Sequence, residues 1–268
     1  MKFALCGAGR VGTSLASSLK SKSWEFLGYY STSYPEFIEK DKRLKSLKDL
    51  EVKGLIVFLA LPDKEIENLS RQLPPYLIIG HMSGSLDYRT IKAAEPSGRF
   101  SIHPLRSIPD YNMDLTGTYW GIEGDEVGIK VAERTVRVLD GKTLYIDSKM
   151  KPLYHMASII STNLLSSLLY LANNLFNECG INSSVATFMG EDTLKNIKNL
   201  GYLNSITGPV ERGDYNTLDR NLKALKKHAS EFLPVVNELL KINLDLAKKK
   251  GLKKEDADRI HSIISTYS

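Results

Sequence analysis

Apolar residues follow a strand-like pattern in the first 150 positions of the chain. Short apolar runs alternate there with segments of helical spacing, and six runs are strand candidates: Lys2–Cys6, Glu25–Tyr30, Leu55–Leu61, Leu77–Gly80, Arg99–His103 and Tyr119–Glu123. The run Leu55–Leu61 is almost wholly apolar, which is typical of a central parallel strand covered on both faces. A helix is expected from about Val11 to Leu19. Strands that alternate with helices predict βαβ units and a doubly wound parallel sheet.

The pattern becomes helical near Lys151. Five helices are expected from there on, at Leu153–Phe176, Ser184–Asn199, Leu218–His228, Phe232–Lys249 and Lys254–Thr266. The sequence therefore predicts an α/β domain over residues 1–150, followed by an all-helical domain for substrate binding and dimerisation over residues 151–268. The helix Leu153–Phe176 is apolar around much of its circumference, which indicates burial on several sides. We expect it to lie in the interface of a homodimer.

Composition and charge exclude several classes of protein. Of 268 residues, 42% are hydrophobic and 25% are charged, which is a globular balance rather than a disordered one. The net charge of +5 is spread among acids and lacks an aromatic platform, so nucleic acid is not an expected partner. The chain has only two cysteines, and its apolar start is too short for a signal peptide, so a cytoplasmic protein is expected. The long apolar helix is interrupted by His155 and three asparagines, which favours a buried helix over a membrane span.

A glycine motif follows the first expected strand. Its residues are Gly7, Ala8, Gly9, Arg10, Val11 and Gly12, and they match GxGxxG at the start of a helix. In this context the glycines permit a tight turn, a close approach to a pyrophosphate, and close packing of helix on strand. The free N–H groups at the helix start would bind the phosphates. The motif therefore predicts a Rossmann-type dinucleotide site; the alternative is a tight turn without a cofactor.

The residues after the second strand indicate which dinucleotide is bound. An NAD site usually has an acidic residue there, about 20 residues after the motif. This chain has Ser31, Thr32 and Ser33 instead, and its next acid is Glu36. Hydroxyl groups and the nearby Arg10 can donate to a 2′-phosphate, so NADP is favoured over NAD. The alternative is that the three hydroxyl residues only end a strand.

Further polar residues follow the later strands, whose carboxyl ends border ligands in such sheets. Leu61 and Pro62 are expected beside the cofactor, with Asp63 capping the next helix. Candidate catalytic residues come from four segments: Ser83, His103, His155 with Asn163, and Arg212. A histidine titrates near neutral pH and is suited to proton transfer, so His155 is the first candidate for the proton donor. Asn163 would orient the substrate, Ser83 would bond to it, and Arg212 would hold an anionic group. Each histidine could equally have a structural role, and Arg212 could belong to a helix–helix loop in which Asp214 caps the next helix.

These motifs together resemble a known family. The segments GAGRVG, ALPD, HMSGS, HPLRS, KPLYHMASIISTN and TGPVERGD are similar to those of Rossmann-like proteins with the domain of unknown function 2520, over about residues 1–240. Relatives of these proteins include ketopantoate reductase, pyrroline-5-carboxylate reductase and 6-phosphogluconate-type dehydrogenases. The resemblance implies an NADP-binding fold, a helical C-terminal domain, a homodimer and an oxidoreductase.

The resemblance leaves the substrate and the proton donor open. Several of those dehydrogenases have a lysine on the first helix of the second domain and an asparagine one turn later, whereas here Lys151 is followed at that spacing by His155. The expected activity is hydride transfer between NADPH and a small carbonyl or imine substrate, for which an anionic molecule is one candidate. The alternative is an NADP(H)-binding sensor or structural protein without turnover. A deazaflavin in place of the nicotinamide also stays open.

Overall fold

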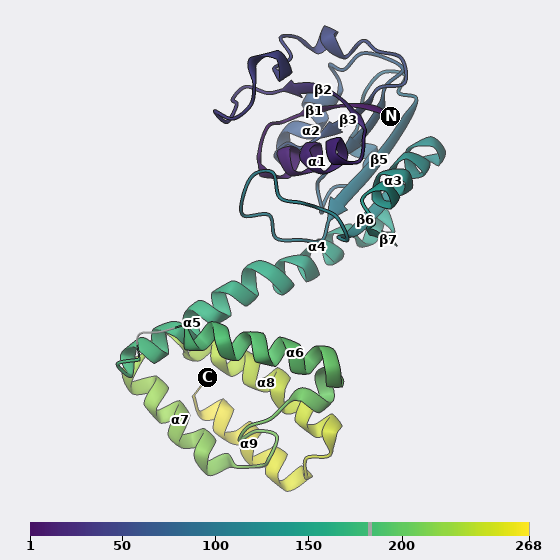
Figure 1. Ribbon diagram of the computed structural model, residues 1–268. Coiled ribbons are helices and arrows are strands. Elements are labelled where there is room, and N and C mark those ends of the chain that lie inside the picture. The colour runs from purple at the N-terminus through teal and green to yellow at the C-terminus, as the bar shows by residue number, and fades with distance from the viewer. Residues whose placement is uncertain (182–183, 268) are drawn as a thin grey trace. The chain divides into compact units, whose positions relative to one another are not determined.

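A single mixed sheet organises the first part of the chain (Figure 1). The computed structural model describes residues 1–181 and 184–267, and within them the sheet has seven strands in the order β2-β1-β3-β4-β5-β6-β7. The strands are β1 (Lys2–Cys6), β2 (Glu25–Tyr30), β3 (Ile56–Leu59), β4 (Ile78–His81), β5 (Gly98–Pro104), β6 (Tyr119–Gly124) and β7 (Lys142–Tyr145). The predicted α/β fold with a doubly wound sheet is confirmed, and β7 is a strand that the apolar pattern did not predict.

The sheet is parallel except for one pair of strands. β5 and β6 run antiparallel, with His103 opposite Gly121, so the predicted parallel sheet contains one antiparallel pair that the sequence pattern did not indicate. The connection between them, residues 105–118, contains no helix. Antiparallel neighbours need no helical crossover, whereas parallel ones do. The parallel order β1-β3-β4-β5 brings the carboxyl ends of four strands to one edge of the sheet.

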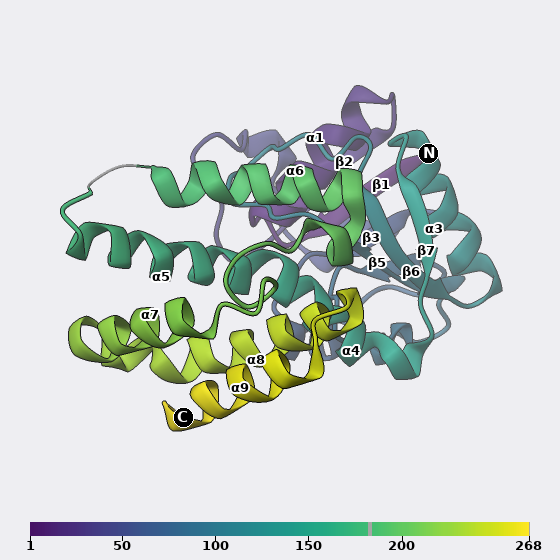
Figure 2. The same cartoon turned by 90° about the horizontal axis from the view of Figure 1, so that it is seen from below.

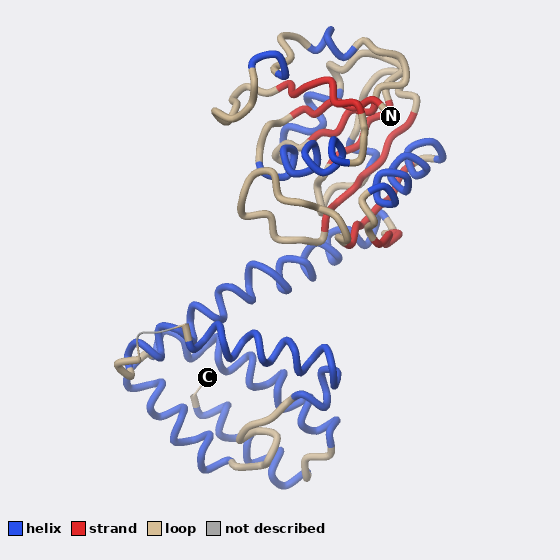
Figure 3. Tube along the Cα trace, viewed as in Figure 1, coloured by secondary structure: helices blue, strands red, loops and turns tan. Residues whose placement is uncertain are grey.

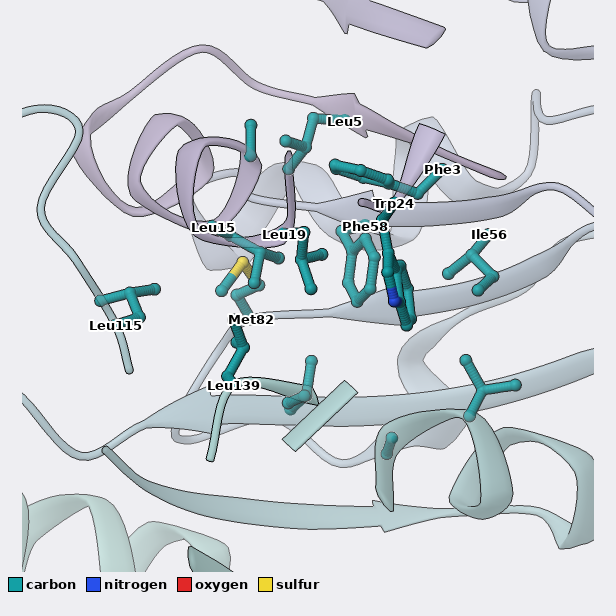
Figure 4. Close-up of a cluster of buried hydrophobic side chains, with 14 of the residues drawn as sticks. Phe3, Leu5, Leu15, Leu19, Trp24, Ile56, Phe58, Met82, Leu115 and Leu139 are labelled. Atoms are coloured by element: carbon teal, nitrogen blue, oxygen red, sulfur yellow. The ribbon is translucent and has the colours of Figure 1, made fainter. Parts of the chain in front are cut away.

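Alternate residues of the strands face two layers of helices. Phe3 and Leu5 pack with α1 (Arg10–Ser21) and α3 (Glu126–Val138) on one face, as Figure 4 shows for the α1 side. Ala4 and Cys6 pack on the other face with α2 (Asp63–Ser70) and with the 3₁₀ turn Leu47–Leu50. Loop residues beside two further 3₁₀ turns, Lys40–Lys42 and Tyr88–Thr90, complete this face. This period-2 alternation of two apolar faces is what a strand buried on both sides requires.

The second part of the chain is helical in the residues described (Figure 3). After the 3₁₀ turn Ser148–Met150 come α4 (Lys151–Ile159), a π-helical turn (Ile160–Leu164), α5 (Leu165–Glu178), α6 (Val185–Ser205), α7 (Tyr215–His228), the 3₁₀ turn Ser230–Phe232, α8 (Leu233–Lys250) and α9 (Lys254–Thr266). Helices α7, α8 and α9 lie side by side (Figure 2) and share a core that includes Leu222, Leu244 and Ile260. The five expected helical segments are all helices, and Asp214 accepts from the backbone N–H of Thr217 as the expected cap of α7.

The chain divides into two units, Met1–Thr162 and Asn163–Ser268. The division falls within the π-helical turn rather than at residue 150, where the change of sequence pattern placed it. The first unit therefore includes all of α4, and with it His155. The reason is an ion pair at the start of α4, described below, that ties this helix to the sheet.

The stretch that contains α4 and α5 exposes apolar side chains. Leu153 is 63% exposed, Ile160 54% and Leu164 50%, and Phe188 on α6 is 72% exposed. By length and composition, the helical stretch Ser148–Glu178 is also apolar enough to cross a membrane. The burial expected of this helix from its sequence is therefore not achieved within a single chain.

Candidate functional site

The glycine motif forms a tight turn between β1 and α1. Gly7 has a φ of +105°, and a β-carbon there would collide with the carbonyl oxygen of Ala60, so no other residue fits. A β-carbon on Gly12 would lie 2.7 Å from the oxygen of Gly7, which shows how closely the helix packs on the strand. At Gly9 a β-carbon would meet nothing within 4 Å. The second glycine therefore borders open space, as the approach of a pyrophosphate requires.

The first turn of α1 has no side-chain cap. Gly9 is the N-cap residue and supplies no side chain, while the hydroxyl of Thr13 turns back to donate to the carbonyl oxygen of Gly9. Ala8 is buried and Val11 packs against the core, so at these positions only the backbone can face a ligand. N–H groups at an uncapped helix start, together with the positive end of the helix dipole, are suited to bind phosphate. The residues present therefore fit the diphosphate of a dinucleotide.

Hydroxyl residues follow β2, as the sequence shows. The backbone N–H of Ser33 donates to the hydroxyl of Ser31 at 3.4 Å, and Thr32 is exposed. Arg10 is exposed as well, and its guanidinium donates to the carbonyl oxygen of Pro109 at 3.1 Å. No ion pair holds this arginine among the residues described, so its charge is uncompensated.

The loop after β3 connects the glycine motif to the loop after β4. A side-chain carbon of Leu61 lies 3.3 Å from the place of a β-carbon on Gly7. Pro62 is the N-cap residue of α2, and Asp63 is its first helical residue, so the expectation that Asp63 caps this helix is wrong. Its carboxylate instead accepts a hydrogen bond of 2.5 Å from the hydroxyl of Ser85. A loop that borders the glycine turn is thus joined to the segment that carries Ser83.

Ser83 stabilises a tight turn after β4. Its hydroxyl oxygen accepts from the backbone N–H groups of Ser85 and Leu86, at 3.2 and 3.1 Å. The side chain is buried, and its carbonyl oxygen accepts from Ser101 of β5. This arrangement places the next residue, Gly84, against β5.

Two imidazoles meet at Gly84. The ring centroids of His103, on β5, and His155, on α4, are 5.6 Å apart. A β-carbon on Gly84 would collide with Nδ1 of His155 and would lie 2.9 Å from Nε2 of His103. Burial lowers the pKa of His103 to about 4, and the neighbouring His155 and Lys151 act in the same direction. His103 is therefore a neutral imidazole at neutral pH.

Both imidazoles have an unusual hydrogen-bond pattern. Nδ1 of His103 is 2.9 Å from the hydroxyl of Tyr154, while Nε2 makes no hydrogen bond to the residues described. Nδ1 of His155 is buried and also lacks a partner there. Buried polar atoms are nearly always paired in folded proteins, so the unpaired Nδ1 of His155, beside the end of β5, marks a place for a ligand group.

A buried ion pair underlies this cluster, and the sequence analysis missed it. The ammonium of Lys151 is 3.3 Å from the carboxylate of Glu123, and the two side chains are 2% and 6% exposed. Burial lowers the pKa of Lys151, and the charge of Glu123 opposes this effect. The lysine also donates to the hydroxyl of Ser101 at 2.5 Å. The sequence offers one signal of this pairing: Glu123 is a charged residue in an otherwise apolar strand, and Lys151 stands before a proline at the start of a helix.

His81 is buried nearby and is neutral. Its Nε2 is 2.9 Å from the carbonyl oxygen of Asp87, and burial lowers its pKa to about 4. Its contact is with backbone, so it supports the turn that contains Ser83. Of the three histidines at the sheet edge, only His103 and His155 face each other.

The remaining candidates belong to the second unit. Asn163 begins that unit within the π-helical turn, and Arg212 is exposed in the loop before α7. His155, Ser83 and His103 thus share the first unit, and Asn163 and Arg212 share the second.

Comparison with solved structures identifies chains of the same fold. A protein of Thermotoga maritima has 23% sequence identity and a TM-score of 0.72, covering 92% of this chain and 99% of its own. A Bacteroides fragilis protein described as a candidate NADP oxidoreductase has 18% identity and a TM-score of 0.69, covering 97% and 98%. The pyrroline carboxylate reductase of Plasmodium falciparum, solved with NADP bound, has 12% identity and a TM-score of 0.63, covering 98% and 99%. No curated protein matches the sequence.

The family expected from the motifs is confirmed for the part of the chain that its profile covers. The profile of the domain of unknown function DUF2520 matches residues 118–238. This match starts just before β6 and ends within α8, and so it includes Glu123, Lys151, Tyr154 and His155. Residues 118–238, a little under half of the chain, are therefore similar to the DUF2520 domain, and the chain as a whole has the fold of the solved structures named above.

Proposed function

We propose that this protein is an NADP-dependent oxidoreductase that transfers hydride between NADPH and a small carbonyl or imine substrate. The observation that carries the proposal is the position of two features at one edge of the sheet. The uncapped start of α1, with open space at Gly9, follows β1. The imidazoles of His103 and His155, the second with an unpaired Nδ1, face each other at Gly84 after β4. The fold shared with a pyrroline carboxylate reductase that binds NADP supports the same cofactor.

Each part of the site has a distinct task in this proposal. The N–H groups of α1 would bind the diphosphate, and Arg10 with the hydroxyl groups of Ser31 and Ser33 would bind the 2′-phosphate. The nicotinamide, when bound, supplies or accepts the hydride. His155 would give the proton that the reduced group needs, and His103 would donate a hydrogen bond to the same group.

The choice of NADP is tested by binding. Calorimetry with NADPH and NADH should show tighter binding of NADPH. Replacing Arg10 with alanine should weaken the binding of NADPH by about 5- to 150-fold, since a charge-assisted contact contributes about 1–3 kcal/mol. The same variant should leave the affinity for NADH nearly unchanged. Equal affinities for the two cofactors in the wild-type protein would contradict the assignment to NADP.

Turnover is tested separately from binding. NADPH oxidation should be measured with a panel of keto acids, ketones and cyclic imines. The His155→Ala variant should lose turnover and keep its affinity for NADPH, while His228→Ala, at an exposed position on α7, serves as the matched control. Binding of NADPH without turnover of any substrate would favour a sensor or structural role instead.

We also infer a homodimer through the long apolar helix. The side chains of Leu153, Ile160 and Leu164 on one helical stretch, and of Phe188 on α6, are half exposed or more, and clustered exposed apolar side chains are typical of a surface that a partner covers. A second copy of the chain would cover this surface with the same residues, as a two-fold interface does. Sedimentation analysis at micromolar concentration should therefore give a dimer.

A further inference from the structure

We propose that Tyr154 is a positioning residue that fixes His103 with its proton on Nε2, and that the substrate group bound there is a carbonyl oxygen rather than an iminium nitrogen. The inference rests on the proposed function, whose substrate could otherwise be a carbonyl or an imine. It concerns a hydrogen bond between α4 and β5, made beside β6. The hydroxyl of Tyr154 lies against the backbone of Gly121 and is hydrogen-bonded to Nδ1 of His103.

The direction of this hydrogen bond follows from the number of protons. The hydroxyl of Tyr154 lies against the backbone of Gly121, and Nδ1 of His103 is 2.9 Å from its oxygen. The phenol has one proton, and among the residues described Nδ1 of His103 is its one acceptor. If Nδ1 carried a proton instead, the phenol oxygen would accept from the ring and the phenol's own proton would have no acceptor among the residues described. Nδ1 of His103 is therefore the acceptor.

The other nitrogen of His103 must then carry the proton. A neutral imidazole has one N–H group, and burial keeps this ring neutral, so an acceptor at Nδ1 leaves the proton on Nε2. Nε2 lies beside Gly84 and makes no hydrogen bond to the residues described. Tyr154 thus leaves one N–H donor of His103 beside Gly84, available to bind a ligand group.

A fixed donor selects between the two substrate classes. A carbonyl oxygen has lone pairs that accept from Nε2–H both before and after the reaction. In the reduction, its carbon gains the hydride of NADPH, which becomes NADP⁺, and its oxygen gains one proton from His155, the donor in the proposed function, to become a hydroxyl. An imine reacts as the iminium ion, whose nitrogen has an N–H and no lone pair, so two donors would face each other. The ammonium of Lys151 near the same ring also disfavours a cation there.

Two glycines and one helix turn make this arrangement possible. A β-carbon on Gly121 would collide with the hydroxyl of Tyr154, and one on Gly84 would collide with His155. Tyr154 and His155 are neighbours on α4, one turn after Lys151, whose ion pair with Glu123 holds the helix start on the sheet. The geometry of the donor is therefore set by the first unit alone.

The tautomer can be observed directly and without a substrate. Nitrogen-15 NMR of the histidine side chains, with His103→Asn to assign the signals, should show His103 neutral and protonated on Nε2 at pH 7. In Tyr154→Phe the preference should weaken, and both tautomers should appear. Tyr170→Phe, at an exposed tyrosine of α5, should leave the spectrum unchanged. A wild-type His103 protonated on Nδ1 would overturn the proposal.

Kinetics test the substrate class. With NADPH, ketones and keto acids should be reduced and cyclic imines should not. Tyr154→Phe should lower kcat by about 2- to 12-fold, the effect of one hydrogen bond, with a smaller change in KM. Preferential reduction of cyclic imines would refute the inference while it upholds the proposed function. Failure to bind NADPH would refute the proposed function, and the tautomer of His103 would still be decided by NMR.

Discussion

Replacing Glu123 with glutamine tests whether the buried ion pair holds α4 on the sheet. The substitution keeps the size of the side chain and removes its charge. In the native protein the carboxylate accepts from Lys151, from the backbone N–H of Tyr88 at 3.0 Å and from the hydroxyl of Ser148 at 2.5 Å. An amide cannot compensate the ammonium, and its own N–H groups would face donors.

The cost is large because both partners are buried. Lys151 is 2% exposed and Glu123 6%, and loss of one partner from such a pair typically costs about 3–5 kcal/mol. A domain of this size is stabilised by about 5–15 kcal/mol in total. At about 2–4 °C per kcal/mol, the melting temperature of the first unit should fall by about 6–20 °C.

Urea denaturation followed by tryptophan fluorescence isolates this effect, since Trp24 and Trp120 are both buried in the first unit and the chain has only these two tryptophans. Lys151→Met should be less harmful in the Glu123→Gln background than alone, because the pair couples the two positions. Glu126→Gln, which breaks an exposed pair with Lys130, should cause no measurable change. Additive losses, or a Glu123→Gln variant as stable as the wild type, would refute this account.

Three further predictions concern acid, a glycine and assembly. The pKa of histidine is near 6.5 in the unfolded chain, whereas the pKa of His81 and of His103 is about 4 in the fold. The free energy of unfolding should therefore fall by up to about 3 kcal/mol for each ring as the pH falls from 6.5 to 4, which denaturation midpoints at several pH values would show. Midpoints that do not change over this range would contradict the burial of the two rings. Gly84→Ala should cost about 1–3 kcal/mol and displace both imidazoles, visible in their NMR signals. Leu164→Glu with Phe188→Glu should convert the expected dimer to a monomer in sedimentation; an unchanged dimer would place the interface elsewhere.

Local patterns were sufficient to predict most of the elements. The strands β1 to β6 are largely buried runs whose apolar residues contribute to one of two apolar faces, and the helices of the second unit repeat their apolar residues at helical spacing. The glycine turn was predictable because Gly7 and Gly12 are needed for local steric reasons. β7 was not predictable, since Lys142–Tyr145 is a short and largely exposed run.

The contacts of the candidate site depend on residues far apart in the chain. His103 and Tyr154 are separated by 51 positions, and Lys151 and Ser101 by 50. The rule that parallel strands end at one edge placed His103 and Ser83 correctly near each other, but it gives no information about α4. The position of α4 depends on the pair between Lys151 and Glu123, and β6 carries Glu123 in the antiparallel direction that the sequence pattern did not indicate.

Chemistry at this edge of the sheet depends on glycines as much as on histidines. Ser83, His103 and His155 are recognisable in the sequence by the reactivity of their side chains, but a side chain acts only where it can approach its partner. The rings of His103 and His155 can pack together because Gly84 has no side chain, and Tyr154 can reach His103 because Gly121 has none. Gly84 in the segment HMSGS and Gly121 in the strand YWGIEG therefore leave room for the neighbouring rings. This room lets Tyr154 bond to Nδ1 of His103, so that Nε2 is the nitrogen available to a ligand.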